Sequence, residues 1–399
     1  MRHVKSHHVI SALTIGGAAF FAFAFSAPPL FENLDSFVLF AQEEIKLEYE
    51  VQVSSGDLGS NKKLDIEKDN IINGNLFAKE ITIDKNSTIN GNVSFNKLKL
   101  NKDSQILGTQ TKPVSLPIAN ISEIPAFPIG TQDFKFEGED NTLAAGSYRN
   151  IILEKNSKLV LNGGTYNLRK LELKDGAVLI FNAPTTLHIQ FKLRGHDKVS
   201  ILPGQNLKPD DLVINYLGIK SKKEKEEKED DDGEIESEMD EKEKKDFKKG
   251  KIGRPIKFGE QSFLNFKLLA PKASVRIGKE SILRGQILAR KIKIEKDGIL
   301  SREEFFEKES DPAKVVEDQG VRFLVNEIII LLSDNATINN AQEIANLVNA
   351  KIDGFVPNPP TYKLNVSANT PAQLFALVQQ IKDAGNPLLI EAIPNLISQ

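Results

Sequence analysis

A repeat of 17 residues constrains the fold of this chain more than any other feature of its sequence. The stretches INGNLFAKEITIDKNST, INGNVSFNKLKLNKDSQ and ILG begin at Ile72, Ile89 and Ile106. Within each unit apolar and polar residues alternate, and Asn-Gly and Lys-Asn-Ser mark turns. Alternation is the period of a β-strand, so short strands and turns at a fixed interval indicate one coil of a β-solenoid.

The energetics of one unit explain the repetition. A single coil buries about four aliphatic side chains at about 1.5–3 kcal/mol each, whereas ordering its backbone costs about 1–2 kcal/mol per residue. Stacked coils share ladder hydrogen bonds and bury each other's faces, so only a stack recovers this cost. We therefore predict a mainly β protein whose residues 60–305 form a parallel β-solenoid, with the right-handed form favoured.

Other stretches extend the solenoid. GSYRNIILEKNSKLVL and GTYNLRKLELKDGAVLI begin at Gly146 and Gly164, 18 residues apart. RGQILARKIKIEKDGIL, residues 284–300, matches residues 73–90 with one deletion in the turn. Residues 111–135 contain four prolines, which cannot donate to a strand ladder, so this segment is predicted to be a linker or a strap across the solenoid.

Residues 218–256 interrupt the solenoid with a run of charge. Nearly every side chain between positions 220 and 251 is Lys, Glu or Asp, so too few apolar groups remain to order the segment. We predict a disordered insert that acts as a solvated spacer. An EF-hand around Gly233 would need Asp and Glu where the chain has Lys228 and Met239, so no metal site is predicted. Residues 306–320 are predicted to be a linker.

The N-terminus has the features of a secretory signal. An apolar run over residues 9–25 follows two basic residues and ends in the small-x-small pattern AFS. Residues 1–26 are therefore predicted to be a signal peptide, with cleavage after Ala41 or an uncleaved anchor as alternatives. In each case the rest of the chain is secreted, periplasmic or on a bacterial cell surface, and it meets the membrane only through this segment.

Residues 321–399 have a different pattern, in which strand and helix periods alternate. Helical spacing extends over 339–351 and over 370–385, the second with Thr370 as N-cap and Gly385 as stop. The strand-like runs are EIIILL at 327–332, KIDGFVP at 351–357, TYKLNVS at 361–367 and PLLIEAIPN at 387–395. The order βαββαβ predicts an α+β domain with a ferredoxin-like fold.

The chain offers few groups for catalysis. It has no cysteine, and its histidines beyond the signal are His188, predicted to face solvent or a groove, and His196, predicted to lie in a turn. No nucleophile elbow, zinc motif or Gly-rich phosphate loop is present. The coil carboxylates each follow a strand beside a lysine, which indicates charge-balanced turns; they are Glu67, Asp84, Glu154 and Glu295. With a net charge of −3, we expect no catalytic residue, no cofactor and no nucleic-acid partner.

The solenoid resembles known families of repeat proteins. INGNLFAKEITIDKNSTINGNV is similar to the polymer-forming bactofilins. Residues 143–301, with LAAGSYRNIILEKNSKLVLNGGTYNL and LLAPKASV, resemble uncharacterised secreted or envelope β-solenoid proteins of bacteria. The resemblance implies a structural protein that can self-associate through its solenoid. Bactofilins are cytoplasmic, so the predicted signal peptide departs from that family.

Residues 321–399 resemble the propeptide or inhibitor module of subtilisin-like proteases in VNEIIILL, AQEIANLVNAKIDGFVPNPPTYKLNV and AQLFALVQQIK. In that family the module packs on the protease through its sheet, and the segment after the last strand lies in the active site like a product. The resemblance implies docking residues at the matching positions, which are Glu391, Ala392, Ile393, Pro394, Asn395 and the tail from Leu396 to Gln399. No protease domain follows, so the expected partner is a separate subtilisin-like protease.

Three functional hypotheses result. The first is a non-enzymatic scaffold, secreted or in the cell envelope, that displays a protein-interaction module. The second is an anchored regulator or inhibitor of a separate subtilisin-like serine protease. The third is a carbohydrate-active β-helix enzyme, which would need acidic side chains clustered across adjacent coils.

Overall fold

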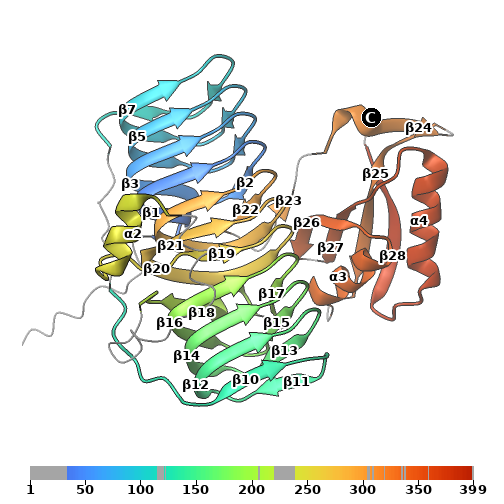
Figure 1. Ribbon diagram of the computed structural model, residues 1–399. Coiled ribbons are helices and arrows are strands. Elements are labelled where there is room, and N and C mark those ends of the chain that lie inside the picture. Colours follow the sequence, from blue (N-terminus) through green and yellow to red (C-terminus); the bar gives the residue numbers. More distant parts are fainter. Residues whose placement is uncertain are drawn as a thin grey trace, which may run out of the picture.

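The structure, a computed structural model, is dominated by a parallel β-solenoid that carries a smaller module on its flank (Figure 1). It describes residues 34–397 except 115–120, 122, 205–206, 220–238, 303–305, 308–309, 319, 334–335, 337 and 358. In this part of the chain the solenoid has about twelve turns. The predicted β class and solenoid architecture are confirmed. The predicted signal peptide, residues 1–26, lies outside the described residues.

The solenoid consists of two tiers, each continuous in sequence. The strands of the first tier are β1 (Phe37–Leu47), β2 (Gln52–Ser55), β3 (Asp57–Ile66), β4 (Ile71–Ile72), β5 (Leu76–Ile83), β6 (Thr88–Ile89), β7 (Val93–Leu100), β8 (Gln105–Ile106) and β9 (Gln110–Thr111). Those of the second tier are β10 (Asp133–Phe136), β11 (Asn141–Leu143), β12 (Gly146–Leu153), β13 (Lys158–Leu161), β14 (Gly164–Leu173), β15 (Val178–Phe181), β16 (Thr185–Gly195), β17 (Ser200–Pro203), β18 (Leu212–Tyr216), β19 (Ile256–Phe258), β20 (Phe263–Ile277), β21 (Ile282–Ile294) and β22 (Ile299–Ser301).

The coils do not stack in chain order. β1 pairs in parallel with β3 on one side and with β21 on the other, so that Ile45 lies between Leu64 and Ile292. The rod therefore runs from β10 through β12, β14 and β16 to the coil of β18 and β19, then through β20 and β21 to β1, and from there through β3 and β5 to β7. The first coil of the chain thus lies in the middle of the rod, where it joins the end of the second tier to the start of the first (Figure 1).

The solenoid begins earlier than predicted. The boundary expected at residue 60 is wrong, because β1 and β2 already belong to the rod and Val38, Ile45 and Val53 are fully buried in its core. Ile45 and Val53 alternate with polar residues, whereas Val38 lies in the apolar run from Phe37 to Ala41, and their coil lacks the INGN turn that marks the later repeats. Cleavage after Ala41 would remove the buried first half of β1 from the centre of the rod.

The glycine of the repeat stands where successive coils come closest. A Cβ atom on Gly91 or Gly108 would collide with the carbonyl oxygen of the equivalent glycine one coil earlier, so no larger residue fits without a shift of the backbone. The turn that precedes this glycine also restricts the type of residue it can contain, because Asn86 in that turn adopts a φ of 59°. Asn and Asp tolerate this left-handed conformation better than other side chains do, which explains their recurrence there.

The proline-rich segment is a strap, one of the two forms predicted for it. In its described part, residue 121 and residues 123–132, Ile121 and Ile124 pack on outward-facing apolar side chains of neighbouring coils. Those side chains include Phe40 on β1, Leu269 on β20 and Leu288 on β21. The strap therefore shields an apolar stripe on the outside of the rod.

The end of the charged insert is ordered, contrary to the disorder predicted for residues 218–256. Helix α2 (Glu241–Lys248) has Asp240 as its N-cap. The carboxylate of Glu243 lies 2.9 Å from Arg290 and 2.7 Å from Lys291, and the side chain of Met239 is buried. The ion pairs of Glu243 and the burial of Met239 thus attach to the solenoid a helix that has too few apolar residues to be expected to pack. The remainder of the predicted disordered insert, residues 220–238, lies outside the described residues.

The C-terminal module is an antiparallel sheet with two helices on one face. Its elements are β23 (Phe306–Glu307), β24 (Val315–Asp318), β25 (Val321–Leu332), α3 (Ile338–Leu347), β26 (Lys351–Pro357), β27 (Pro360–Asn365), α4 (Pro371–Asp383) and β28 (Leu389–Leu396). β25 pairs with β27 and β28, and β26 pairs with β27. The linker predicted at 306–320 is wrong, because β23 and β24 pair with β26 and β25 and extend the sheet.

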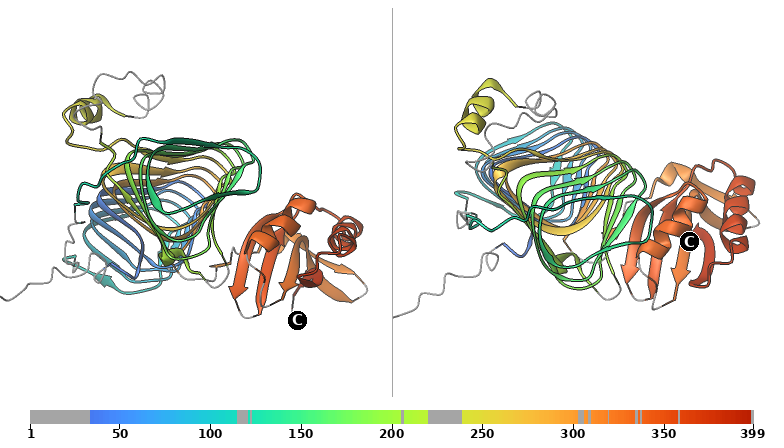
Figure 2. Two further views of the ribbon diagram at one scale, coloured as in Figure 1. Left: turned by 90° about the horizontal axis from the view of Figure 1, so that it is seen from below. Right: turned by 60° about the horizontal axis from the view of Figure 1, so that its bottom comes forward.

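The module is attached to the solenoid through side chains. Leu202, Phe263, Ile282 and Ile299 point out of the rod and share one core with the helix side of the module. The guanidinium of Arg284 lies over the Phe355 ring, 5.2 Å from its centroid. Viewed along the rod, the module and α2 lie on opposite sides of the solenoid (Figure 2).

Candidate functional sites

The predicted docking residues from Glu391 to Asn395 lie on β28, which pairs with β25. Ala392 is fully buried in the helix-side core, whereas Ile393 is 37% exposed. Glu391 lies 2.6 Å from Lys382 of α4. The Asn395 amide donates to the buried Glu327 at 2.7 Å. Gln399 is outside the described residues. The structure therefore places Glu391 to Asn395 in one strand of the fold.

The outer edge of β28 is a poor template for another strand. Among the described strands β28 pairs only with β25. The Ala392 N–H donates to the Glu391 carboxylate at 3.0 Å, and Pro394 has no N–H to offer. Proline and charge are the usual means by which a protein protects a strand edge. The following residue Ile397 donates its N–H to the Arg322 carbonyl at 2.9 Å, so the tail is held in the sheet up to that point.

The side of the module's sheet opposite the helices, which we call the open face, combines apolar with polar and charged side chains. The residues that share this side of the sheet by register include the apolar Ile329 and Leu331 of β25, Val356 of β26 and Ile393 of β28, and the polar Thr361 and Lys363 of β27 and Glu391 of β28. The residues between them on β25 and β28 are fully buried under the helices. Val356 is 47% exposed. An antiparallel sheet that faces water is expected to alternate apolar and polar residues, but β25 is apolar on both sides from Ile328 to Leu332.

A second cluster lies on the solenoid around Glu172, which is buried. Its carboxylate lies 2.7 Å from Lys170, 3.4 Å from Lys192 and 3.0 Å from His196 Nε2, and it also pairs with Lys174. Burial alone would raise the pKa of Glu172, but the hydrogen bonds from His196, Lys170 and Lys174 hold that pKa far below its ordinary range. Glu172 is therefore a fixed negative charge and has no proton to give in catalysis.

The histidines have structural surroundings. His196 lies beyond the end of β16, as the predicted turn requires, and is bound to Glu172. His188 faces out of the rod as expected, but its ring is packed against Phe127 of the strap with 5.0 Å between ring centroids. Burial lowers the pKa of His188. The prediction of a solvated or groove histidine missed this cover because the strap comes from another part of the chain.

A row of cations runs along the outside of the solenoid. Arg194, Lys257, Arg276, Lys293 and Lys46 occupy one register position on β16, β19, β20, β21 and β1. We call this row the basic ladder. Each member is half-buried and stands between inward-pointing neighbours, so its charged end faces outward. Parallel strands lie about 4.8 Å apart, so the backbones of successive members are separated by about that distance.

The upper and lower parts of the basic ladder have different neighbours. The residues that directly follow β21 and β1 are Glu295 and Glu48, and Glu48 lies 2.8 Å from Lys293. The corresponding residues after β19 and β20 are Gly259 and Gly278, which carry no charge. Glu295 pairs with Arg276 on β20 as well as with Lys293, so the acidic turns predicted to balance the cations are present beside β20, β21 and β1.

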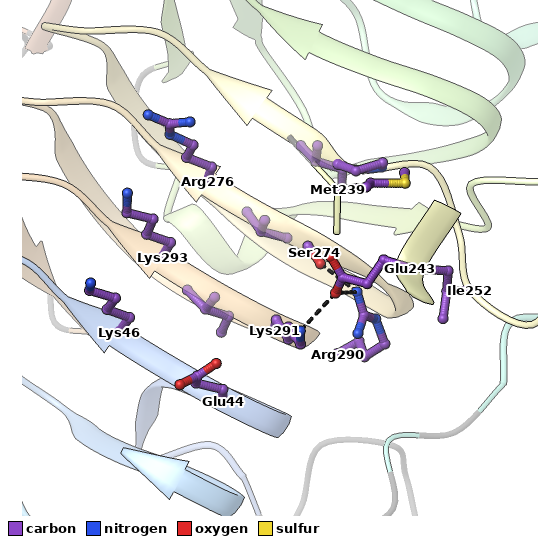
Figure 3. A pocket seen from close by; sticks show the side chains of 14 residues that line it. Glu44, Lys46, Met239, Glu243, Ile252, Ser274, Arg276, Arg290, Lys291 and Lys293 are labelled. Carbon is purple, nitrogen blue, oxygen red and sulfur yellow. Dashed lines mark hydrogen bonds and ion pairs between the residues drawn. The ribbon is translucent and has the colours of Figure 1, made fainter. Parts of the chain in front are cut away.

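A cavity of about 290 Å³ lies between α2 and the upper end of the basic ladder (Figure 3). Its lining includes Lys46, Lys293 and Arg276, which Figure 3 shows on three successive strands. Glu243 of α2 and Arg290 close one side. Arg290 is 8% exposed, and its Nε is buried with no hydrogen-bond partner among the described residues.

Sequence reasoning missed the basic ladder although a local signal exists. KIKI at 291–294 and SVRI at 274–277 place a cation between apolar residues near the end of a strand. The sequence pattern does not show that Lys46 lies next to Lys293. Their neighbouring positions arise because β1, the first strand of the chain, pairs with β21 at the end of the second tier.

Comparison with known proteins identifies no family. No family model matches the chain, and no curated protein matches it significantly. A similar solved structure is the ice-binding protein of the Antarctic ascomycete Antarctomyces psychrotrophicus, which is 14% identical, with 67% of this chain and 95% of that chain covered and a TM-score of 0.28. So low a TM-score carries no argument about function.

No helix in the described part of the chain is long and apolar enough to cross a membrane. No group of three or more His, Cys, Asp or Glu side chains in the same residues is arranged to hold a metal ion.

Proposed function

We propose that this protein is a non-enzymatic scaffold, secreted or in the cell envelope, whose solenoid displays the C-terminal module as an interaction domain. The observation that carries the proposal is the division of the module's sheet into two faces. The helix side shares a core with the solenoid, whereas the open face points away from that core and sets apolar side chains beside Thr361, Lys363 and Glu391. An uncovered face that combines apolar and charged side chains, on a domain attached to a rod through a shared core, suits a protein that positions a partner.

The state of the carboxylates supports a non-enzymatic role. A general acid requires a raised pKa. Every carboxyl group with a displaced pKa in the described part of the chain is displaced downward; these are Glu43, Glu48, Asp84, Glu172, Asp210, Glu241, Glu243 and Glu391. In most of them hydrogen bonds and nearby cations outweigh burial. This pattern favours the scaffold over the carbohydrate-active enzyme.

The scaffold proposal requires a fixed distance between the solenoid and the module. Because the chain has no cysteine, spin labels on Lys155→Cys and Ala376→Cys would report that distance uniquely. We expect a narrow distance distribution in the full chain and a broad one after Ile282→Asp, which places a charge in the shared core. Leu107→Asp, at a site 65% exposed on the rod, is the matched control. An equally broad distribution in the unaltered protein would refute a rigid display.

A second candidate is regulation of a subtilisin-like protease. The element order βαββαβ and the strand neighbours β26-β27-β25-β28 support a ferredoxin-like module, the fold expected from the resemblance. Titration of the full chain into a subtilisin-type protease, with a small peptide substrate as readout, tests this role. Inhibition lost in Ile393→Asp but kept in Val321→Asp would support docking through the open face. Absence of inhibition at micromolar concentrations would refute the protease-regulator role, and the scaffold role would be the one that stands.

A further inference from the structure

The two ends of the solenoid are formed by the coils that precede and follow the strap. The upper end is the coil of residues 93–111, with β7, β8 and β9, and the lower end is the coil of residues 130–145, with β10 and β11. We propose that the upper end of one copy of this chain binds the lower end of another, so that the rods stack head to tail. The inference concerns the ends of the solenoid and holds whether or not the open face binds a partner.

Neither end is capped in the described part of the chain. The helices α2, α3 and α4 lie beside the rod, and both ends of the rod extend beyond the module (Figure 1). No described strand pairs with the outer edge of residues 97–100 on β7 or with the outer edge of β10. An unpaired strand edge is a template for a further strand, and a stack of repeats normally protects its ends with capping units.

The end coils expose side chains whose counterparts elsewhere form the core. Ile83 on β5 is fully buried, whereas Leu100, which pairs with it one coil higher, is 42% exposed. At the lower end, Phe134 and Phe136 are only partly buried against the core. A further coil on each end would remove these apolar surfaces from water, and the burial of apolar surface is the main driving force of association.

The two ends continue one another in register. Strand pairing carries the position of Leu100 through every coil of the rod to Phe136. When β10 of a second copy adds to β7 as strands do inside the rod, Leu98 lies beside Phe134 and Leu100 lies beside Phe136. The apolar side chains of the two copies then meet in one continuous core.

The strap reaches both ends on the same side of the rod. Thr111, the last residue of β9, pairs with Ser94, and register carries the position of Ser94 to Ser147 at the lower end. The chain rejoins the rod there, because a Cβ atom on Gly130 would touch the carbonyl oxygen of Ser147. The strands that would meet in a stack, β7 beyond residue 97 with β8 and β10 with β11, lie past this point on both ends.

The two ends carry opposite net charge. The upper coil has three lysines and one aspartate, a net charge of +2; these are Lys97, Lys99, Lys102 and Asp103. The lower coil has four acidic residues and one lysine, a net charge of −3; these are Asp133, Glu137, Glu139, Asp140 and Lys135. Opposite charges attract unlike ends and repel like ends, so charge selects the head-to-tail arrangement.

The charges of the end turns are available for this contact. Lys102 lies in the turn after β7, and Glu139 and Asp140 lie in the turn after β10, at the same corner of the rod. All three side chains are exposed, and none of them belongs to an ion pair within the described residues.

The strands themselves contribute less to the attraction. In register Lys97 meets Asp133, but each has an exposed partner in its own copy, at 3.8 Å and 3.4 Å. Lys99 meets Lys135, whose charge is balanced by Glu137 at 3.1 Å. Because the two ends are different surfaces, each added copy presents the same free end again, and the contact produces an open filament.

The test is sedimentation velocity of the full chain over a range of concentrations, with electron microscopy of negatively stained samples as a direct view of the rods. We expect the mean size to rise with concentration and the images to show rods joined end to end. At about 0.5 M salt, where screening shortens electrostatic range to a few ångströms, association should weaken.

Charge reversal shows which ends meet. Lys99→Glu/Lys102→Glu and Glu139→Lys/Asp140→Lys should each weaken association about tenfold, because attraction between the ends becomes repulsion. The chain that carries all four substitutions has opposite charges again and should associate like the parent. Stacking of like ends would show no such recovery.

The matched control is Lys242→Glu/Lys245→Glu, which makes the same change of charge at two exposed positions on α2 and should leave association unchanged. All the substituted side chains are exposed, and circular dichroism checks the fold of each variant. A parent that stays monomeric, association that ignores either reversal, or no recovery in the fourfold variant would each overturn the proposal. Association through the apolar run at residues 9–25 would ignore the reversals and would thus be recognised.

Discussion

The Glu172 cluster yields a stability prediction that can be worked out from its geometry. Glu172→Gln keeps the size of the side chain but removes the charge shared by Lys170, Lys174, Lys192 and His196. Lys170 and Lys174 can turn toward water, whereas the Lys192 side chain is only 2% exposed and would remain buried. Loss of one partner from a buried pair costs about 3–5 kcal/mol, and we expect the lower end, about 3 kcal/mol at pH 7.

The pH dependence follows from the direction of the Glu172 shift. The folded-state pKa is depressed, so the stabilisation is complete above the ordinary value of 4.5 and is lost as pH falls below it. Each pH unit below that value removes about 1.4 kcal/mol. Glutamine does not titrate, so the difference between Glu172 and Gln should fall from about 3 kcal/mol at pH 7 to about 1 kcal/mol at pH 3.

The assay is urea unfolding followed by circular dichroism at both pH values, with amide hydrogen exchange in β14 and β16 as a local readout. Local exchange is needed because the coils of a repeat protein need not unfold together. Glu154→Gln is the control, since Glu154 forms a more exposed pair with Lys135 and should cost less than about 1 kcal/mol. If Glu172→Gln lowers the free energy of unfolding by less than about 1 kcal/mol at pH 7, or by an amount that does not change with pH, the reasoning is refuted.

Other substitutions test the turns and the docked helix. Asn70→Ala should destabilise the rod by about 2–3 kcal/mol, because the buried amide accepts from the Val51 N–H at 2.8 Å and donates to the Glu67 carbonyl at 2.7 Å; an unchanged urea midpoint would contradict this. Lys198→Gly should raise stability by about 0.5–1 kcal/mol, since Lys198 has a φ of 58°, and a lower midpoint would count against backbone strain. Glu243→Gln should speed amide exchange throughout α2 several-fold by weakening two ion pairs, whereas equal protection in variant and parent would mean that apolar contacts hold the helix.

The strands of the solenoid could be predicted because their pattern is local. Leu76, Ala78, Ile81 and Ile83 alternate in the sequence and are all buried in the core. The 17-residue interval is likewise visible in single contacts, such as the Asn92 N–H that donates to the Asn75 side chain one coil away. A coil that repeats its hydrogen bonds must repeat the residues that make them, so the sequence carries the period directly.

The order of the coils could not be predicted, because the repeat says that coils stack but not which edges meet. β1 has compatible edges on both sides, and only its contacts with β21 and β3 show that it joins the tiers. The basic ladder and the Phe127–His188 contact depend on the same long-range arrangement. The alternation around Ile393 predicted a strand, whereas the Glu391 contact with the Ala392 N–H depends on one rotamer and has no sequence signal.

The place of β1 in the middle of the rod has a consequence for biosynthesis. The first tier is made first, but one edge of β1 has no partner until β21 is translated much later. An unpaired strand edge promotes aggregation. We therefore expect the first tier to stay unfolded, or to have this edge covered, until the last strands of the second tier have been translated. Cutting the strap after folding would leave the rod joined by the β1–β21 ladder. The same cut in the nascent chain would separate two fragments, each lacking the neighbour that completes it.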